Sequence, residues 1–187
     1  MANKNEPFGL RAIGKVGQNR DNQGLSEYSI AANYATTIFF QDAVKPVATG
    51  TVEKAAAGER LLGSLNGVFY TDPNTSKPTF ANHYAQVNAS DTVAFVSDDP
   101  YERFEIQSDA ALAVADVGLN ADIVYAAGAS PNFISKVELD HSDLATTGEQ
   151  LRVIGISKDP QNDEAGAADV NAVVIINEHF LKGTVGI

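Results

Sequence analysis

Hydrophobic and polar residues alternate over short stretches of the chain, and turn-forming residues separate these stretches. Residues 103–107 and 136–140 alternate with a period of two, which predicts strands whose apolar side chains, among them Phe104 and Leu139, face a core. Residues 92–96 are apolar on both faces and predict a more fully buried strand. Further strands are predicted at 28–32, 37–40, 45–49, 67–71, 79–84, 151–158 and 172–176.

Proline-containing segments indicate how some of these strands are joined. The segment DPNTSKP lies between 67–71 and 79–84 and predicts a hairpin with a long loop. The tripeptide Asp-Asp-Pro at 98–100 predicts a turn, because a residue that precedes proline is disfavoured in a helix. Pro46 places its strand at a sheet edge or at a strand start.

Helical patterns are scarce. Asp109 is a candidate cap for a helix of about two turns that Gly118 would end, and 178–182 is a candidate single turn. The spacing of strands and turns predicts an all-β fold, a sandwich or barrel of short antiparallel strands with one short helix and an extended N-terminal arm.

Charge is distributed unevenly over the 187 residues, whose net charge is −11. Residues 1–20 hold four basic residues and one acidic residue, a charge of +3, and the remainder carries −14. We therefore divide the chain into an N-terminal arm, 1–25, and a β-rich body, 26–187. The arm is too polar and too rich in glycine to fold alone, so it is either a frayed terminus or a segment that docks on a partner.

Composition excludes several classes of function. The chain contains no cysteine, which rules out disulfides, thiolate metal sites and a cysteine nucleophile. The strongly acidic balance argues against nucleic acid as a partner. No apolar run is long enough to cross a membrane, and the first residues lack the apolar core of a signal peptide. We expect no cofactor and no nucleic-acid or membrane partner.

Four fragments resemble catalytic or ligand-binding motifs without completing them. Residues 9–15 match the spacing of a phosphate-binding loop, but Val16 replaces the hydroxyl residue. Residues 159–163 have calcium-loop spacing without the required glycine or the closing glutamate. Residues 140–142 are an Asp, a His and a Ser, but sequence neighbours point in different directions. The carboxylates in 98–105 could serve a glycosidase only if two of them faced each other across a sugar cleft.

The order of segments resembles the head decoration, or cement, proteins of tailed bacteriophages. The resemblance is carried by PFGLRAIGKVG, SEYSIAANYATTIFFQDAV, GSLNGVFYTDPNTSKPTFANHY, VSDDPYERFEIQSD, DVGLNADIVYAAG, SKVELD, LRVIGISKDPQNDEAG and VVIINEHFL. It spans residues 7 to 182 but includes no catalytic motif. It implies a structural virion protein, made in the host cytoplasm, that lies on the capsid exterior. Such a protein is expected to bind the major capsid protein lattice, commonly as a homotrimer, and to staple neighbouring capsomers together.

The arm is the segment that we expect to bind a partner. Its candidate apolar anchors are Phe8, Leu10 and Ile13, and its candidate ion-pairing residues are Arg11, Lys15 and Arg20. These cations would meet either acidic groups of the capsid or the acidic body of a neighbouring copy. Removing 1–20 should then leave a folded body. A phage tail or host-recognition protein and a carbohydrate-active β-barrel enzyme remain alternative functions.

Overall fold

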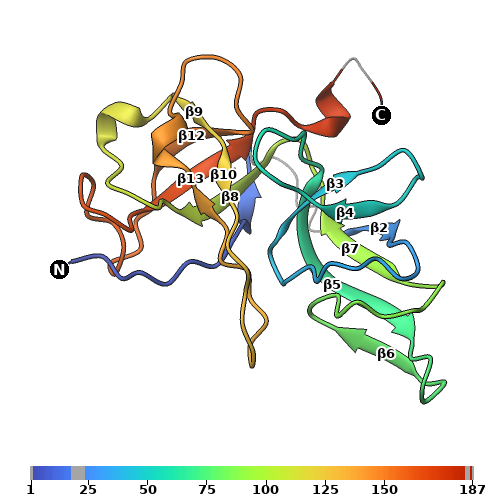
Figure 1. Ribbon diagram of the computed structural model, residues 1–187. Coiled ribbons are helices and arrows are strands. Elements are labelled where there is room, and N and C mark those ends of the chain that lie inside the picture. The colour runs from blue at the N-terminus through green and yellow to red at the C-terminus, as the bar shows by residue number, and fades with distance from the viewer. Residues whose placement is uncertain (1, 18–23, 184–185, 187) are drawn as a thin grey trace.

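The computed structural model describes residues 2–17, 24–183 and 186, and it confirms the predicted all-β class (Figure 1). All pairs between the named strands are antiparallel, and no α-helix occurs in the described part of the chain. The structure is consistent with the predicted sandwich, with its two main sheets on either side of the molecule in Figure 1. The only helical segments among the described residues are the 3-10 turns η1 (Val114–Asp116), η2 (His141–Asp143) and η3 (Phe180–Lys182).

Sheet A has five strands in the order β1-β8-β13-β12-β9. Their bounds are β1 Arg11–Lys15, β8 Glu102–Gln107, β13 Asn171–Ile176, β12 Leu151–Ile156 and β9 Asn120–Ala121. A separate pair consists of β10 (Ile123–Val124) and β11 (Glu138–Leu139).

Sheet B has the order β2-β7-β5-β3-β4, and β6 pairs with one half of the long strand β5. The bounds are β2 Ser26–Ser29, β3 Ala43–Pro46, β4 Val52–Lys54, β5 Gly63–Thr71, β6 Pro78–Ala81 and β7 Val93–Ser97. The predicted hairpin with the long loop is the β5–β6 pair. Pro46 ends β3 rather than starting it, and it lies opposite Val52 of β4. Residues 37–40 form isolated bridges instead of a strand.

All of sheet B is inserted into the chain between two adjacent strands of sheet A. The chain forms β1, then β2 to β7, and returns as β8, which pairs with β1 (Figure 1). The predicted boundary at residue 25 therefore separates β1 from the sheet to which it belongs. Residues 11–15 are a strand of the body and not part of a free arm, because β8 supplies their hydrogen-bond partners from about 90 residues away.

Each sheet packs against its own core, and two short segments join the cores. On β3, Ala43 lies in the core of sheet A and Val44 in the core of sheet B. The adjacent residues Leu61 and Leu62 divide in the same way. Since successive side chains of an extended chain point to opposite sides, these two segments form a shared wall between the cores.

The helix predicted after Asp109 is reduced to the single turn η1. Leu112 is fully buried in the core of sheet A, and the Asp116 carboxylate accepts a hydrogen bond from the Ala113 N–H at 2.7 Å. This bond closes one turn of chain. A run of two turns is too short to be a stable helix without further packing.

Candidate functional site

The N-terminal segment, where the sequence predicts partner contacts, packs against its own chain. Leu10 is 0% exposed in the core of sheet A, and its N–H donates to the Gln41 carbonyl at 2.9 Å. The preceding Gly9 has a φ of +78°, and a Cβ at this position would lie 2.4 Å from the same carbonyl. Glycine is thus required where the chain turns to insert Leu10.

Two of the three predicted ion-pairing residues have acidic partners within the chain. Arg11 pairs with Glu105 of the neighbouring strand β8, and Lys15 pairs with Asp99. The hydrogen bond from Lys15 holds the pKa of Asp99 below its usual value. Arg20 lies outside the described residues. The first two cations therefore join β1 to its own body in the free chain.

Of the predicted apolar anchors, only Ile13 is exposed, at 45% of its surface. Phe8 is half-buried, and the Arg11 guanidinium lies 4.4 Å from its ring centroid. Together with the buried Leu10, these positions show that the segment contributes to the body. In the free chain Ile13 is exposed and Phe8 is only partly covered.

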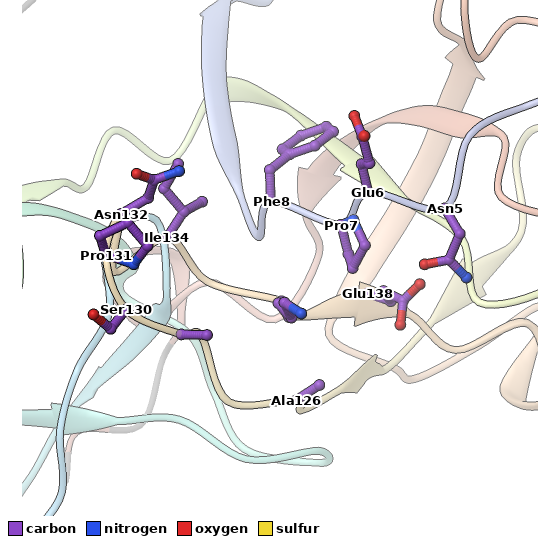
Figure 2. Close-up of a pocket in the computed structure, with 12 residues that line it drawn as sticks. Asn5, Glu6, Pro7, Phe8, Ala126, Ser130, Pro131, Asn132, Ile134 and Glu138 are labelled. Atoms are coloured by element: carbon purple, nitrogen blue, oxygen red, sulfur yellow. The ribbon is translucent and has the colours of Figure 1, made fainter.

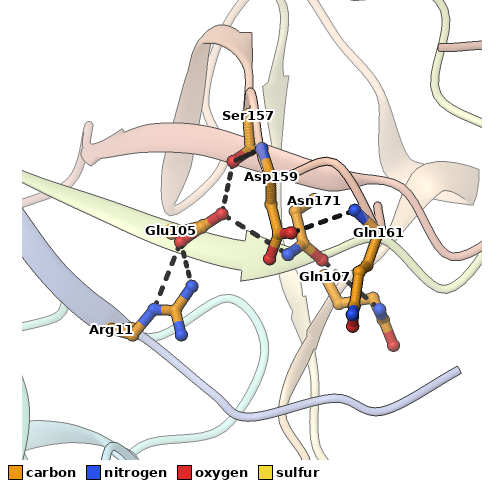
Figure 3. Close-up of polar contacts among 7 residues, drawn as sticks. All are labelled: Arg11, Glu105, Gln107, Ser157, Asp159, Gln161 and Asn171. Atoms are coloured by element: carbon orange, nitrogen blue, oxygen red, sulfur yellow. Dashed lines mark hydrogen bonds and ion pairs between the residues drawn. The ribbon is translucent and has the colours of Figure 1, made fainter. Parts of the chain in front are cut away.

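A polar network ties the strands of sheet A together beside Arg11 (Figure 3). The buried Glu105 carboxylate accepts hydrogen bonds from Arg11, from Ser157 and, at 3.4 Å, from Asn171. These partners belong to β1, to the residue after β12, and to β13. A buried carboxylate is tolerated when it is paired and hydrogen-bonded, as here. The network accounts for the acidic residue in the middle of β8.

Residues 3–6 cross the loop between β12 and β13 through polar bonds alone. The Asn3 amide donates to the Ala168 carbonyl at 2.9 Å, and Lys4 Nζ donates to Gln161 at 3.0 Å. Asn5 donates to Asp169 at 3.0 Å. The Lys4 carbonyl also accepts hydrogen bonds from the buried side chains of Gln107, at 2.8 Å, and Asn162, at 2.7 Å. The first residues thus follow the surface of the body, held by both exposed and partly buried hydrogen bonds.

The fragment with calcium-loop spacing, 159–163, and the Asp-His-Ser fragment, 140–142, both form local turns. Asp159 accepts a hydrogen bond from the Gln161 N–H at 3.0 Å, as in an Asx turn. Asp140 caps η2 and accepts the Ser142 hydroxyl at 2.6 Å. The carboxylate in 140–142 therefore bonds the serine instead of orienting the histidine as a triad requires. Within the described ranges, no three acidic or histidine side chains gather as a metal site needs.

A groove separates the N-terminal segment from the loop that joins β10 to β11 (Figure 2). We call it the N-terminal groove; it has a volume of about 740 Å³. It is lined by Asn5, Glu6, Pro7, Phe8, Ala126, Ala129, Ser130, Pro131, Asn132, Ile134, Lys136 and Glu138. Volumes of this size are typical of binding sites.

Sheet B carries an exposed patch of aromatic side chains that the sequence analysis did not identify. Phe69 on β5 lies directly opposite Phe80 on β6, and the Phe80 ring lies 6.0 Å from that of Phe95 on β7. Phe80 is 66% exposed. Gly67 makes room for it, since a Cβ there would lie 2.9 Å from the Phe80 ring. We call Phe69, Phe80 and Phe95 the aromatic face.

The alternation of side chains along β5 is the feature of the sequence that could have predicted the aromatic face. Val68 and Tyr70 are buried, so Phe69 between them must point to the other side of the sheet. Strands β5, β6 and β7 also contain no charged residue. A sheet face with three phenylalanines and a single neighbouring carboxylate, Glu27 opposite Phe95, is a candidate interaction surface.

Two buried groups of the body titrate far from their ordinary pKa values. Burial raises the pKa of Asp42 to about 6, outweighing the hydrogen bond from the Phe39 N–H and the attraction of Lys54. Burial, with the nearby Lys182, lowers the pKa of His179 to about 4. His179 is 1% exposed, and its Nδ1 accepts a hydrogen bond from the Leu181 N–H at 3.0 Å.

Comparisons with protein-family models, with curated proteins and with solved structures found no match. Among the described residues, no helix is long and apolar enough to cross a membrane.

Proposed function

We propose that the chain is a structural virion protein of the capsid decoration, or cement, class. In this role it binds the outer surface of the major capsid protein lattice as a homotrimer and staples neighbouring capsomers together. The resemblance in the order of segments selects the class. The aromatic face is the structural observation that carries the proposal.

The aromatic face suits a protein that holds other subunits together. Phe69 and Phe80 expose apolar surface in the free chain, and burying a phenylalanine side chain contributes about 1.5–3 kcal/mol. Because β5, β6 and β7 carry no charge, a lattice subunit can cover Phe69 and Phe80 with little desolvation of ionised groups, and Glu27 of β2, opposite Phe95, lies at the border of the face. Burial of this face against the lattice would therefore supply much of the binding energy.

The structure alters the part that the N-terminal segment plays in this proposal. Arg11 and Lys15 already have acidic partners in the chain, and Leu10 is in the core. We therefore assign the main lattice contact to the aromatic face instead of an extended arm. Ile13 remains available as an additional apolar contact.

Replacing Phe80 by serine should weaken binding to empty expanded capsids about five- to thirtyfold, because burial of the exposed two thirds of Phe80 is worth about 1–2 kcal/mol. Binding would be measured by co-sedimentation with capsids of the major capsid protein encoded in the same genome. The matched control is Val114→Ser, at a position 68% exposed on η1, which should bind as the unaltered chain does. Equal binding of Phe80→Ser and the control would contradict the role of the aromatic face.

A further inference from the structure

The N-terminal groove has walls that are held in place by the body. Its loop wall is anchored to sheet-B segments, since the Phe40 N–H donates to the Phe133 carbonyl at 2.9 Å and the Phe133 ring stacks on His83 at 3.9 Å. Its other wall ends at Phe8, beneath the Arg11 guanidinium. A ligand would therefore meet a groove that is already formed, which reduces the entropy lost on binding.

One part of the groove is lined by apolar side chains. Phe8 and Pro7 line it from the N-terminal segment, and Pro131 and Ile134 line it from the loop (Figure 2). Ala129 of the same loop also lines the groove. Side chains of this kind accept aliphatic groups and give little directional selectivity. The apolar part alone thus indicates a ligand with hydrocarbon side chains.

The other part of the groove is acidic. Glu6, Glu138 and the cation Lys136 line it, a net charge of −1, and neither glutamate forms an ion pair with any residue in the described ranges. Burial raises the pKa of Glu138, and repulsion from Asp109 and Asp169 raises it further, although Lys136 opposes the change. The surroundings of Glu138 thus carry an excess of negative charge, which a cation from outside would offset.

We infer that the N-terminal groove binds an extended segment of a partner protein in which a lysine or arginine is flanked by aliphatic residues. The cation would reach Glu138 and Glu6, and the aliphatic side chains would cover Phe8 and Pro131. Charge complementarity selects this occupant over an acidic or purely apolar segment. This site is separate from the aromatic face and does not depend on the proposed capsid function.

The probe is an N-acetylated, C-amidated peptide of sequence GLARLAG, with GLAELAG as its charge-reversed counterpart. Each is titrated to millimolar concentration into the full isotope-labelled chain, and amide chemical shifts are followed by NMR. The arginine peptide should shift amides of residues 5–8 and 126–138 in a saturable manner, and the glutamate peptide should not. Glu138→Gln should weaken binding of the arginine peptide about two- to fivefold, the range of one partly exposed ion pair.

Glu27→Gln is the matched control, because Glu27 is an exposed carboxylate on β2 that does not line the groove. It should leave the arginine peptide's affinity unchanged. Saturable shifts that map to the groove, favour arginine over glutamate and weaken in Glu138→Gln would support the site. Shifts elsewhere on the chain, equal shifts from both peptides, or none at millimolar concentration would overturn it. None of these readouts involves a capsid, so the site and the proposed function fail independently.

Discussion

Replacing Leu10 by alanine is expected to lower the free energy of unfolding by about 2–5 kcal/mol, the range for truncation of a fully buried leucine. Leu10 is 0% exposed and lies in the core of sheet A with residues such as Phe104 and Ile106. The loss includes the transfer of the removed methyl groups and the cavity that they leave. Urea denaturation followed by circular dichroism would measure it.

Ile13→Ala is the matched control on the same segment, because Ile13 is 45% exposed and its truncation should change stability by only about 0.5 kcal/mol. Deletion of residues 1–17 should destabilise the body at least as much as Leu10→Ala, since it also removes β1 and the pairing of Arg11 with Glu105. The sequence alone predicted a folded body after such a deletion. Equal stability of the truncated and intact chains would restore that prediction.

The second large effect concerns Asp42, whose pKa is raised to about 6 in the folded chain. The folded state binds this proton more tightly than the unfolded state, whose Asp pKa is near 3.9. Burial of the charged form therefore costs about 3 kcal/mol of stability at pH 7, and the cost disappears as the pH falls from about 6 to about 4. Lowering the pH from about 6 to about 4 should therefore remove the destabilising contribution of Asp42.

His179 has the opposite effect on folding stability over nearly the same range of pH. Its folded pKa of about 4 lies below the ordinary value of 6.5, so the folded state favours the neutral ring. The corresponding stability is fully present above about pH 6.5 and is lost as the pH falls toward 4, roughly 3 kcal/mol in all. The two residues should therefore nearly cancel in the intact chain.

Substituting each residue separately should reveal the cancellation. Relative to the unaltered chain, the stability of Asp42→Asn should fall by about 3 kcal/mol between pH 7 and pH 4, and that of His179→Asn should rise by a similar amount. Urea midpoints measured at intervals of pH would give both curves, whichever variant is the less stable at pH 7. Two curves parallel to that of the unaltered chain would contradict these assignments.

The strands were predictable where the period-two pattern coincided with burial on one face. Phe104 and Ile106 of β8 are fully buried, as the alternation indicated. The short strands β4, β9 and β10 were missed because two or three residues hold too little pattern. Strand β1 was missed for another reason: its segment has scattered apolar residues, and its partner lies far along the chain.

The candidate surfaces were less predictable from the sequence than the strands, because they depend on tertiary structure. Leu10 and Ile13 look equivalent in the sequence, but one is in the core and the other is exposed. The groove was not predictable, since its two walls are more than 100 residues apart. The aromatic face was closer to prediction, because the alternation within β5 already turns Phe69 outward, although only the pairing with β6 places Phe80 beside it.

The most direct test of the proposed function is the position of the chain in an intact particle. Cryo-electron microscopy of virions from the phage that encodes it would locate a body with two adjacent β-sheets. We predict density for this chain on the capsid exterior, at three-fold or quasi-three-fold positions, with the aromatic face against the lattice. Density for the chain in the tail, or its absence from the head, would contradict the proposed function.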